Sequence, residues 1–396
     1  MLTYDQALTQ ILGQIAPLPP VAVPLADALG CVLAEDVFAP QDAPPFDNSS
    51  MDGFAVRAAD LANIPATLPV SGDVPAGALS LPALTFRSAL RIMTGAPVPP
   101  GADTVVPVED TEERDGGVTF LQPIELGQNI RRAGEDVAAG SLVMASGSPI
   151  RPAEVGMAAV VGRAHLRAHP RPCVAIISTG DELIEPGRPL LPGQIYNSNA
   201  YALAAQVAEA GGVVTHRLHA RDTAEALCEA FDQTVGADVL LTSGGVSVGD
   251  YDYVKAVFAE RGTMDFWRVA IRPGKPVAFG RWGETLFFGL PGNPVSSMVT
   301  FELFVRPALR RLRGLAETAR PTVIARLTED AGHTPGRQSY QRAVVTHEGG
   351  GHAVMPIAKQ GSGMMRSMVQ ANALLVIPAD VSVIPAGQTA TVILLD

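Results

Sequence analysis

The segment CVAIISTGDEL, residues 173–183, is the strongest single indication of the fold. Five apolar residues lead directly into hydroxyl, glycine and carboxylate side chains, a pattern typical of a strand that is buried on both faces. The segments after it alternate, and they predict strands over 213–218 and 237–242 and helices over 200–210, 222–234 and 251–261. This order is typical of βαβ units and predicts a doubly wound, mostly parallel α/β domain.

Further elements extend this pattern along the chain. Additional strands are predicted over 266–271, 276–279 and 286–290. Asn293 and Pro294 mark the start of a long apolar helix, which Pro307 is expected to kink or interrupt. Near the N-terminus, Thr3 and Gln6 have the spacing of a capping box before a helix with one apolar face.

The pattern changes twice, which predicts an α/β multidomain protein. Short apolar runs broken by Pro, Gly, Asp and Asn precede the α/β segments and favour β-rich units, and similar runs after residue 320 indicate a small all-β domain. We predict an N-terminal helix packed on the α/β domain, 1–19; a discontinuous linking α+β unit, 20–38 and 141–170; a β-rich unit, 39–140; the α/β domain, 171–320; and a β-barrel-like domain, 321–396.

Composition and charge exclude several classes of protein. The chain has 396 residues, 47% of them apolar, so it can bury sizeable cores. Its 29 Lys and Arg against 40 Asp and Glu give a net charge of −11, and nucleic-acid binding is therefore not expected. No apolar run reaches the roughly 20 residues of a membrane helix, and no signal-peptide pattern opens the chain. Three scattered cysteines without a CxxC fit a reducing cytoplasm.

Polar residues follow the predicted strands. They are STGDE at 178–182, RD at 221–222, SGGVSVGDYD at 243–252 and PGNP at 291–294. Ligands of an open parallel sheet bind beyond the carboxyl ends of its strands. We therefore interpret these residues as the rim of a binding site, in which the backbone N–H groups of glycines and helix N-termini bind a phosphate. Tight turning without a ligand is the alternative for Gly244, Gly245 and Gly249. For Asp222 the alternative is helix capping, and for Asp181 and Glu182 it is a solvated turn.

Basic residues gather in WRVAIRPGKP, residues 267–276. On one continuous strand, Arg268 and Arg272 have the same parity and point to the same side. Planar guanidinium groups suit tetrahedral oxyanions, which makes these arginines and Lys275 a candidate anion site. The alternative is an edge strand whose charges discourage aggregation.

The carboxylates of the chain suggest a cation. Asp52, Asp136, Asp222, Asp250 and Asp252 would repel one another in a single cleft unless a hard divalent cation neutralised them, and Mg²⁺ is the natural candidate. The sequence contains no Walker A, GxGxxG, HExxH or GxSxG motif, so the standard nucleotide, zinc-protease and serine-hydrolase sites are not predicted.

Seven motifs, in order, carry a resemblance to a known family. They are PPFDNSSMDGFA (44–55), RIMTGAPVP (91–99), GQNIRRAGED (127–136), STGDEL (178–183), SGGVSVGDYDY (243–253), IRPGKP (271–276) and GLPGNPVS (289–296). Together these motifs are specific, and they span essentially the whole chain. On their basis the chain resembles the molybdopterin molybdenumtransferase family. That family includes bacterial MoeA and the molybdenum-inserting domain of gephyrin.

The resemblance implies an enzyme of molybdenum cofactor synthesis that takes adenylylated molybdopterin and molybdate, releases AMP and uses Mg²⁺. At matching positions it implies catalytic roles for Asp52, Thr94, Asp136, Glu182, Asp222 and Asp252. We take Glu182, Asp222 and Asp252 among them as the metal ligands. Substrate-binding roles are implied for Ser243, Gly244, Gly245, Ser247, Arg268, Arg272, Lys275, Pro291, Pro294, Arg342 and Ser362. Arg268 and Arg272 stand where many members carry Lys.

The resemblance also implies a homodimer in which the β-rich unit of one subunit completes the active site of the other. A molybdopterin adenylyltransferase is expected as the substrate donor, because the adenylyltransferase domain that is fused in gephyrin is missing before the first helix. Molybdoenzymes or their chaperones are the expected acceptors. Two alternatives stay open: the adenylyltransferase itself, whose βαβ unit and SGG loop are similar, and a non-enzymatic scaffold similar to gephyrin.

Overall fold

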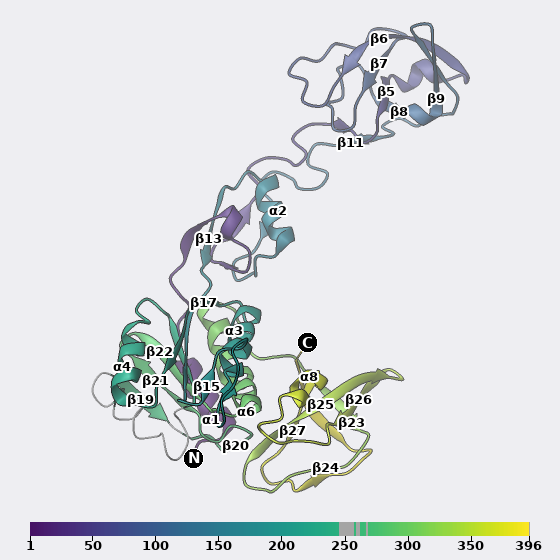
Figure 1. The fold of residues 1–396 in the computed structure, drawn as a ribbon. Coiled ribbons are helices and arrows are strands. Elements are labelled where there is room, and N and C mark those ends of the chain that lie inside the picture. Colours follow the sequence, from purple (N-terminus) through teal and green to yellow (C-terminus); the bar gives the residue numbers. More distant parts are fainter. Residues whose placement is uncertain (245–256, 259–261, 267, 396) are drawn as a thin grey trace.

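A computed structural model shows the α/β domain and a C-terminal barrel at one end of the molecule and a β-rich unit at the other (Figure 1). It describes residues 1–244, 257–258, 262–266 and 268–395. After the first helix the chain runs out through a linking unit to the β-rich unit and then returns to the α/β domain. The outgoing and the returning segments of the chain therefore lie side by side in the linking unit.

Six strands form the central sheet, in the order β17-β14-β18-β22-β21-β19. β17, β14, β18 and β22 pair with one another in parallel, whereas β21 pairs antiparallel with both β22 and β19. The bounds in that order are Val213–Ala220, Cys173–Thr179, Val239–Ser243, Thr285–Leu290, Ala278–Trp282 and Gly262–Phe266.

The predicted strand over 266–271 is wrong. β19 ends at Phe266, and a separate two-residue strand, β20 (Ile271–Arg272), pairs in parallel with a strand of the C-terminal barrel. The break has a physical reason: the N–H of Ala270 donates to the carbonyl oxygen of Leu2 at 2.8 Å, so the backbone here finds its partner outside the central sheet.

Helices cover both faces of the sheet, which confirms the doubly wound prediction. Val174 and Ile176 of β14 share one apolar core with four helices, whereas Ala175 and Ile177 share a second core with α4. The four helices of the first core are α1 (Tyr4–Gly13), α3 (Ser198–Glu209), α6 (Pro294–Thr300) and α7 (Arg306–Leu312), and α4 spans Ala224–Asp232. Because successive strand residues point to opposite faces, burial on both sides explains the continuous apolar run.

Two helix ends test the sequence rules directly. The capping box is confirmed, because Thr3 Oγ1 accepts from the N–H of Gln6 and Gln6 Oε1 accepts from the N–H of Thr3. The helix predicted from Asn293 is interrupted as expected near Pro307. A π-helical turn, η4 (Phe301–Val305), separates α6 from α7, and Pro307 stands in the first turn of α7, where proline is tolerated.

The linking unit combines two chain segments around one apolar core. Its elements are β1 (Val21–Pro24), η1 (Leu25–Asp27), β2 (Val32–Leu33), β3 (Val37–Phe38), β12 (Leu142–Met144), α2 (Pro152–Val160) and β13 (His165–His169). The strands pair as β1-β13-β2 and β12-β3. The domain limits given above stay a prediction.

The β-rich unit is a six-stranded sheet in the order β8-β5-β7-β6-β10-β9. In that order the bounds are Thr104–Pro107, Gly53–Val56, Ala89–Ile92, Ala66–Val74, Gly117–Phe120 and Thr111–Arg114. Two short 3-10 helices, η2 (Ala58–Leu61) and η3 (Val108–Asp110), accompany it, and β4 (Asn48–Ser49) pairs with β11 (Ile130–Arg131).

The C-terminal strands close into a small barrel, as predicted. They pair in the order β25-β26-β23-β29-β27, and β27 pairs back onto β25. In that order the bounds are Gln338–Glu348, Gly351–Pro356, Thr322–Leu327, Thr389–Leu394 and Ala373–Ile377. The short pair β24 (Ala331–Gly332) and β28 (Val383–Ile384) and the helix α8 (Arg366–Gln370) complete it.

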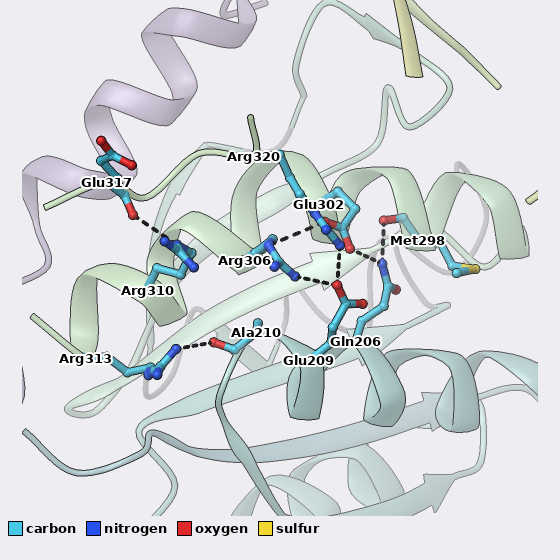
Figure 2. Close-up of polar contacts among 10 residues, drawn as sticks. All are labelled: Gln206, Glu209, Ala210, Met298, Glu302, Arg306, Arg310, Arg313, Glu317 and Arg320. Carbon is cyan, nitrogen blue, oxygen red and sulfur yellow. Dashed lines mark hydrogen bonds and ion pairs between the residues drawn. The ribbon is translucent and has the colours of Figure 1, made fainter. Parts of the chain in front are cut away.

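A buried cluster of charged side chains ties the start of the barrel to the α/β domain (Figure 2). Arg320, just before β23, donates to Glu302 Oε2 at 2.9 Å and to Glu209 Oε1 at 2.6 Å. Gln206 Nε2 donates to Glu302 Oε1 at 2.7 Å, and Arg306 donates to Glu209 at 3.3 Å. The side chains of Glu302 and Arg320 are only 4% and 7% exposed, so the pair is shielded from water and from screening.

Candidate functional site

A pocket of about 350 Å³ opens at the carboxyl ends of β14, β18 and β22. Ser178 of β14 pairs with Ser243 of β18, and Ser243 pairs with Leu290 of β22, so the three strands end level with one another. Six predicted site residues therefore line one pocket: Glu182, Asp222, Ser243, Gly244, Pro291 and Pro294. Gly245, Ser247 and Asp252 lie outside the described residues, as does most of the helix predicted over 251–261.

Gly244 is the point where three pocket loops approach most closely. It has φ +94°, and a Cβ atom placed on it would lie 2.8 Å from the carbonyl oxygen and the hydroxyl of Thr179. On the other side, a Cβ on Gly292 would lie 3.6 Å from the Cα of Gly244. Glycine is thus required both by the backbone conformation and by the space available.

Gly244→Ala is expected to be more destabilising than the same change at Gly236. Both glycines have a left-handed φ, +94° and +91°, but a Cβ on Gly236 meets nothing within 4 Å. We expect Gly236→Ala to cost about 1–2 kcal/mol of unfolding free energy and Gly244→Ala about 1–3 kcal/mol more, from the added steric contact. Urea unfolding of the two variants measures the difference, and equal losses would contradict the close approach at Gly244.

The two carboxylates that line the pocket come from different loops, Glu182 from the loop after β14 and Asp222 from the loop after β17. Helix capping is the wrong interpretation for Asp222, because the N-cap of α4 is Thr223, whose side chain accepts from the N–H of Ala226. Glu182 lies against Gly180, where a Cβ would be 2.6 Å from the Glu182 carboxylate. Both carboxylates thus line a pocket that also has hydroxyl and amide groups in its wall.

The predicted basic cluster does not line this pocket. Arg268 is outside any strand and Arg272 belongs to β20, so the shared-strand argument for their orientation fails. Both side chains are exposed, as is that of Lys275, and only the following Pro276 lines the pocket. Their predicted role in anion binding stays a prediction.

Arg342 lies inside the barrel wall. It is 1% exposed, and its guanidinium donates to Ser367 Oγ at 3.1 Å and to the carbonyl oxygen of Gly361 at 3.3 Å. Burial lowers the pKa of Arg342 to about 10. The backbone carbonyl oxygen of the next residue of that loop, Ser362, accepts from the N–H of Val295 in α6 at 3.0 Å. Arg342 therefore holds the loop that brings Ser362 to the edge of the pocket beside Pro294.

The remaining predicted site residues, Asp52, Thr94 and Asp136, do not line this pocket. Asp52 Oδ1 accepts from the backbone N–H and from the hydroxyl of Thr94, each at 2.7 Å. These hydrogen bonds lower the pKa of the Asp52 carboxyl below its ordinary value. Asp136 lines a different cleft with Asp42 and Glu135. In Figure 1 the strands next to Asp52 and Thr94, β5 and β7, are far from the α/β domain, so one chain does not bring these residues to the pocket.

Thr94→Val is expected to raise the pKa of the Asp52 carboxyl part of the way to its ordinary value. The substitution removes the hydroxyl donor and keeps the backbone N–H, which is the larger cause of the lowered pKa. Because the pKa is lowered in the folded state, the associated stabilisation is present above the pKa of the unfolded chain and is lost as the pH falls through the folded value. Carbon-13 NMR titration measures the shift, with Thr67→Val in the same sheet as a control that leaves it unchanged.

Two asparagines of the pocket were not predicted. Asn197 caps α3, and Asn199 Nδ2 donates to Ser243 Oγ at 2.8 Å and to the carbonyl oxygen of Gly292 at 2.7 Å. The signal in the sequence is the pair of Asn residues around Ser198, directly before an apolar helix. Such residues are ordinary helix starts, and only the fold shows that the second one reaches two other loops.

The donor chemistry of the pocket fits a hard cation. Within the described ranges no group of three or more His, Cys, Asp or Glu side chains is arranged to hold a metal ion. Glu182 and Asp222 nevertheless line the same pocket, and carboxylate oxygens are the ligands that Mg²⁺ prefers. The third predicted ligand, Asp252, is outside the described residues.

Comparisons with known proteins match nearly the whole chain to a single family. Sequence profiles of the MoeA N-terminal region (domain I and II), a probable molybdopterin binding domain and the MoeA C-terminal region (domain IV) match residues 2–162, 175–311 and 325–395. Molybdopterin molybdenumtransferase 2 of Mycobacterium tuberculosis is 45% identical over 379 residues, which cover 93% of each chain. The chain belongs to the molybdopterin molybdenumtransferase family.

Other members support the same assignment. The molybdopterin molybdenumtransferase of Haemophilus influenzae is 38% identical over 99% of this chain and 98% of its own. A crystal structure of the molybdopterin biosynthesis MoeA protein from Pyrococcus horikoshii, 31% identical, covers both chains completely with a TM-score of 0.73. The predictions of the family and of a transferase in molybdenum cofactor biosynthesis are confirmed. None of the helices in the described part of the chain has the length and apolar character needed to cross a membrane.

Proposed function

We propose that this protein inserts molybdenum from molybdate into molybdopterin that arrives in its adenylylated form, with release of AMP. The observation that carries the proposal is the pocket at the strand ends, which Glu182 and Asp222 line together with Ser243, Gly244 and Gly292. Members named molybdopterin molybdenumtransferase supply the substrate class. A site that handles a phosphoanhydride needs acceptor oxygens for a cation beside donors for a phosphate, and both are present here.

Phosphate binding is assigned to groups at the strand ends. The N–H of Gly244 donates to the carbonyl oxygen of Leu290 at 3.2 Å, so the backbone donors that we assign to the phosphate are those at the N-terminus of the 12-residue helix α3, whose Asn197–Ser198 turn lines the same pocket. Ser243 supplies a hydroxyl. We assign the arginines Arg268 and Arg272, with Lys275, to the binding of molybdate at the outer edge of the site, where their exposed charges attract an oxyanion.

Glu182 and Asp222, with Asp252, are the residues that we expect to hold Mg²⁺. When bound, this ion offsets the negative charge that develops on the phosphoanhydride as it breaks. The two carboxylates would hold the ion in place, and water is the group that attacks. We expect Asp52 to act from the second subunit, and substitution of Asp52, Asp222 and Asp252 in turn identifies the general base.

A homodimer completes the site in this proposal. Asp52 and Thr94 lie beside β5 and β7 of the distant β-rich unit, and Asp136 lines a separate cleft with Val160 of the linking unit, so a second copy is needed to bring such residues to the pocket. The linking unit offers an apolar surface for that contact: Phe38 and Leu142 are paired across β3 and β12, and each is 51% exposed. Sedimentation equilibrium tests the dimer, and a monomeric mass at micromolar concentration would contradict it.

The decisive experiment is release of AMP from adenylylated molybdopterin, measured with and without molybdate in the presence of Mg²⁺. Molybdate-dependent AMP release is the expected result. Synthesis of adenylylated molybdopterin from ATP without any need for molybdate would instead support the adenylyltransferase. In the cell we expect an adenylyltransferase as the substrate donor and molybdoenzymes or their chaperones as acceptors. The three cysteines are free thiols, which fits a cytoplasmic location.

A further inference from the structure

Asn199 connects three of the loops that form the pocket. It is the second residue of α3, and its carboxamide nitrogen donates to the hydroxyl of Ser243 and to the carbonyl oxygen of Gly292. A carboxamide has two N–H donors on one planar group, so these two hydrogen bonds use both of them and set the separation of their partners. The loops that follow β18 and β22 are thereby attached to the start of a helix that follows β14.

The orientation of this side chain follows from its partners. If the amide were turned over, its oxygen would face the carbonyl oxygen of Gly292, and two acceptors would repel each other. In the observed orientation, Asn199 Oδ1 is buried and has no hydrogen-bond partner among the described residues. The two hydrogen bonds made by the nitrogen therefore determine which way the amide faces.

This geometry also determines what Ser243 can do. Its oxygen accepts from Asn199, and the hydroxyl hydrogen cannot point back at that nitrogen because the nitrogen has no lone pair to offer. Ser243, which lines the pocket, is therefore left with a donor for a ligand oxygen. We propose that Asn199 is a positioning residue of the active site: it makes Ser243 a hydrogen-bond donor and fixes the Gly292 loop, so that both can hold a phosphate oxygen of the substrate. This inference rests on the proposed function.

A double-mutant cycle with Asn199→Ala and Ser243→Ala tests the inference through AMP release. Asn199→Ala is expected to raise the KM for adenylylated molybdopterin about ten-fold with a smaller change in kcat, because it removes two hydrogen bonds that organise binding. Since Asn199 acts through Ser243, the double variant should be little worse than the worse single variant. Multiplicative losses in KM, or an unchanged KM in Asn199→Ala, would overturn the inference.

Asn197→Ala is the matched control. It changes the same residue type in the same helix start and removes the cap of α3, but Asn197 makes no hydrogen bond to Ser243 or Gly292 among the contacts described. Its effect should therefore multiply with that of Ser243→Ala. Thermal unfolding of every variant separates loss of fold from loss of binding. If the unmodified protein releases no AMP, the proposed function fails; if it does and the cycle shows no coupling, only the role of Asn199 fails.

Discussion

Glu302→Ala is expected to lower the free energy of unfolding by about 3–5 kcal/mol, the usual cost of removing one partner from a buried ion pair. The side chain of Glu302 is 4% exposed and accepts from both Arg320 and Gln206. Without it, the charge of Arg320 stays buried with only the half-exposed Glu209 as an acidic partner. Chemical denaturation followed by circular dichroism measures the loss.

Glu317→Ala is the control for this prediction. Glu317 is exposed and takes part in the contacts of Figure 2 only through its backbone carbonyl oxygen, which accepts from Arg310. Its substitution should change stability by less than about 0.5 kcal/mol. Glu302→Gln, which keeps the shape and an acceptor, should fall between the two. A loss below about 1 kcal/mol in Glu302→Ala would show that the cluster does not hold the barrel start to the α/β domain.

Asp222→Asn is expected to reduce the rate of AMP release about 100-fold or more. The substitution keeps the size of the side chain but removes a negative charge from the pocket, and loss of a metal-held charge is worth several kcal/mol in the transition state. Raising the Mg²⁺ concentration should recover part of the rate. The measurement is steady-state AMP release as a function of Mg²⁺ concentration. A variant as active as the unmodified protein would show that Asp222 is not a metal ligand.

Asp181→Asn is the matched control for Asp222→Asn. Asp181 is next to Glu182 in sequence, but it is exposed and does not line the pocket. Asp181→Asn removes the same charge from a position outside the pocket, so its effect on the rate of AMP release should be small. Similar losses in both variants would indicate a general electrostatic effect instead of a specific ligand.

Much of the candidate site was accessible from the sequence because strand ends are local features. The level ends of β17, β14 and β18 follow from parallel pairing, and this is why Asp222, Glu182 and Ser243, which end or follow these strands, meet in one pocket. The orientation of Arg268 and Arg272 could not be predicted in the same way. It depended on an unbroken strand, whereas the backbone between them pairs with Leu2 near the N-terminus.

The sequence by itself determined the order of the elements, the cap of α1, the sheet buried on both faces and the polar residues at the strand ends. All of these depend on periodicity and hydrogen bonding within a few residues. Only the tertiary structure decided that Asn199 joins Ser243 to Gly292, that Arg342 is buried behind the Ser362 loop, and that Asp52 is far from the pocket of its own chain. Those relations join residues far apart in the sequence, and they depend on how packed units meet, which no local pattern encodes.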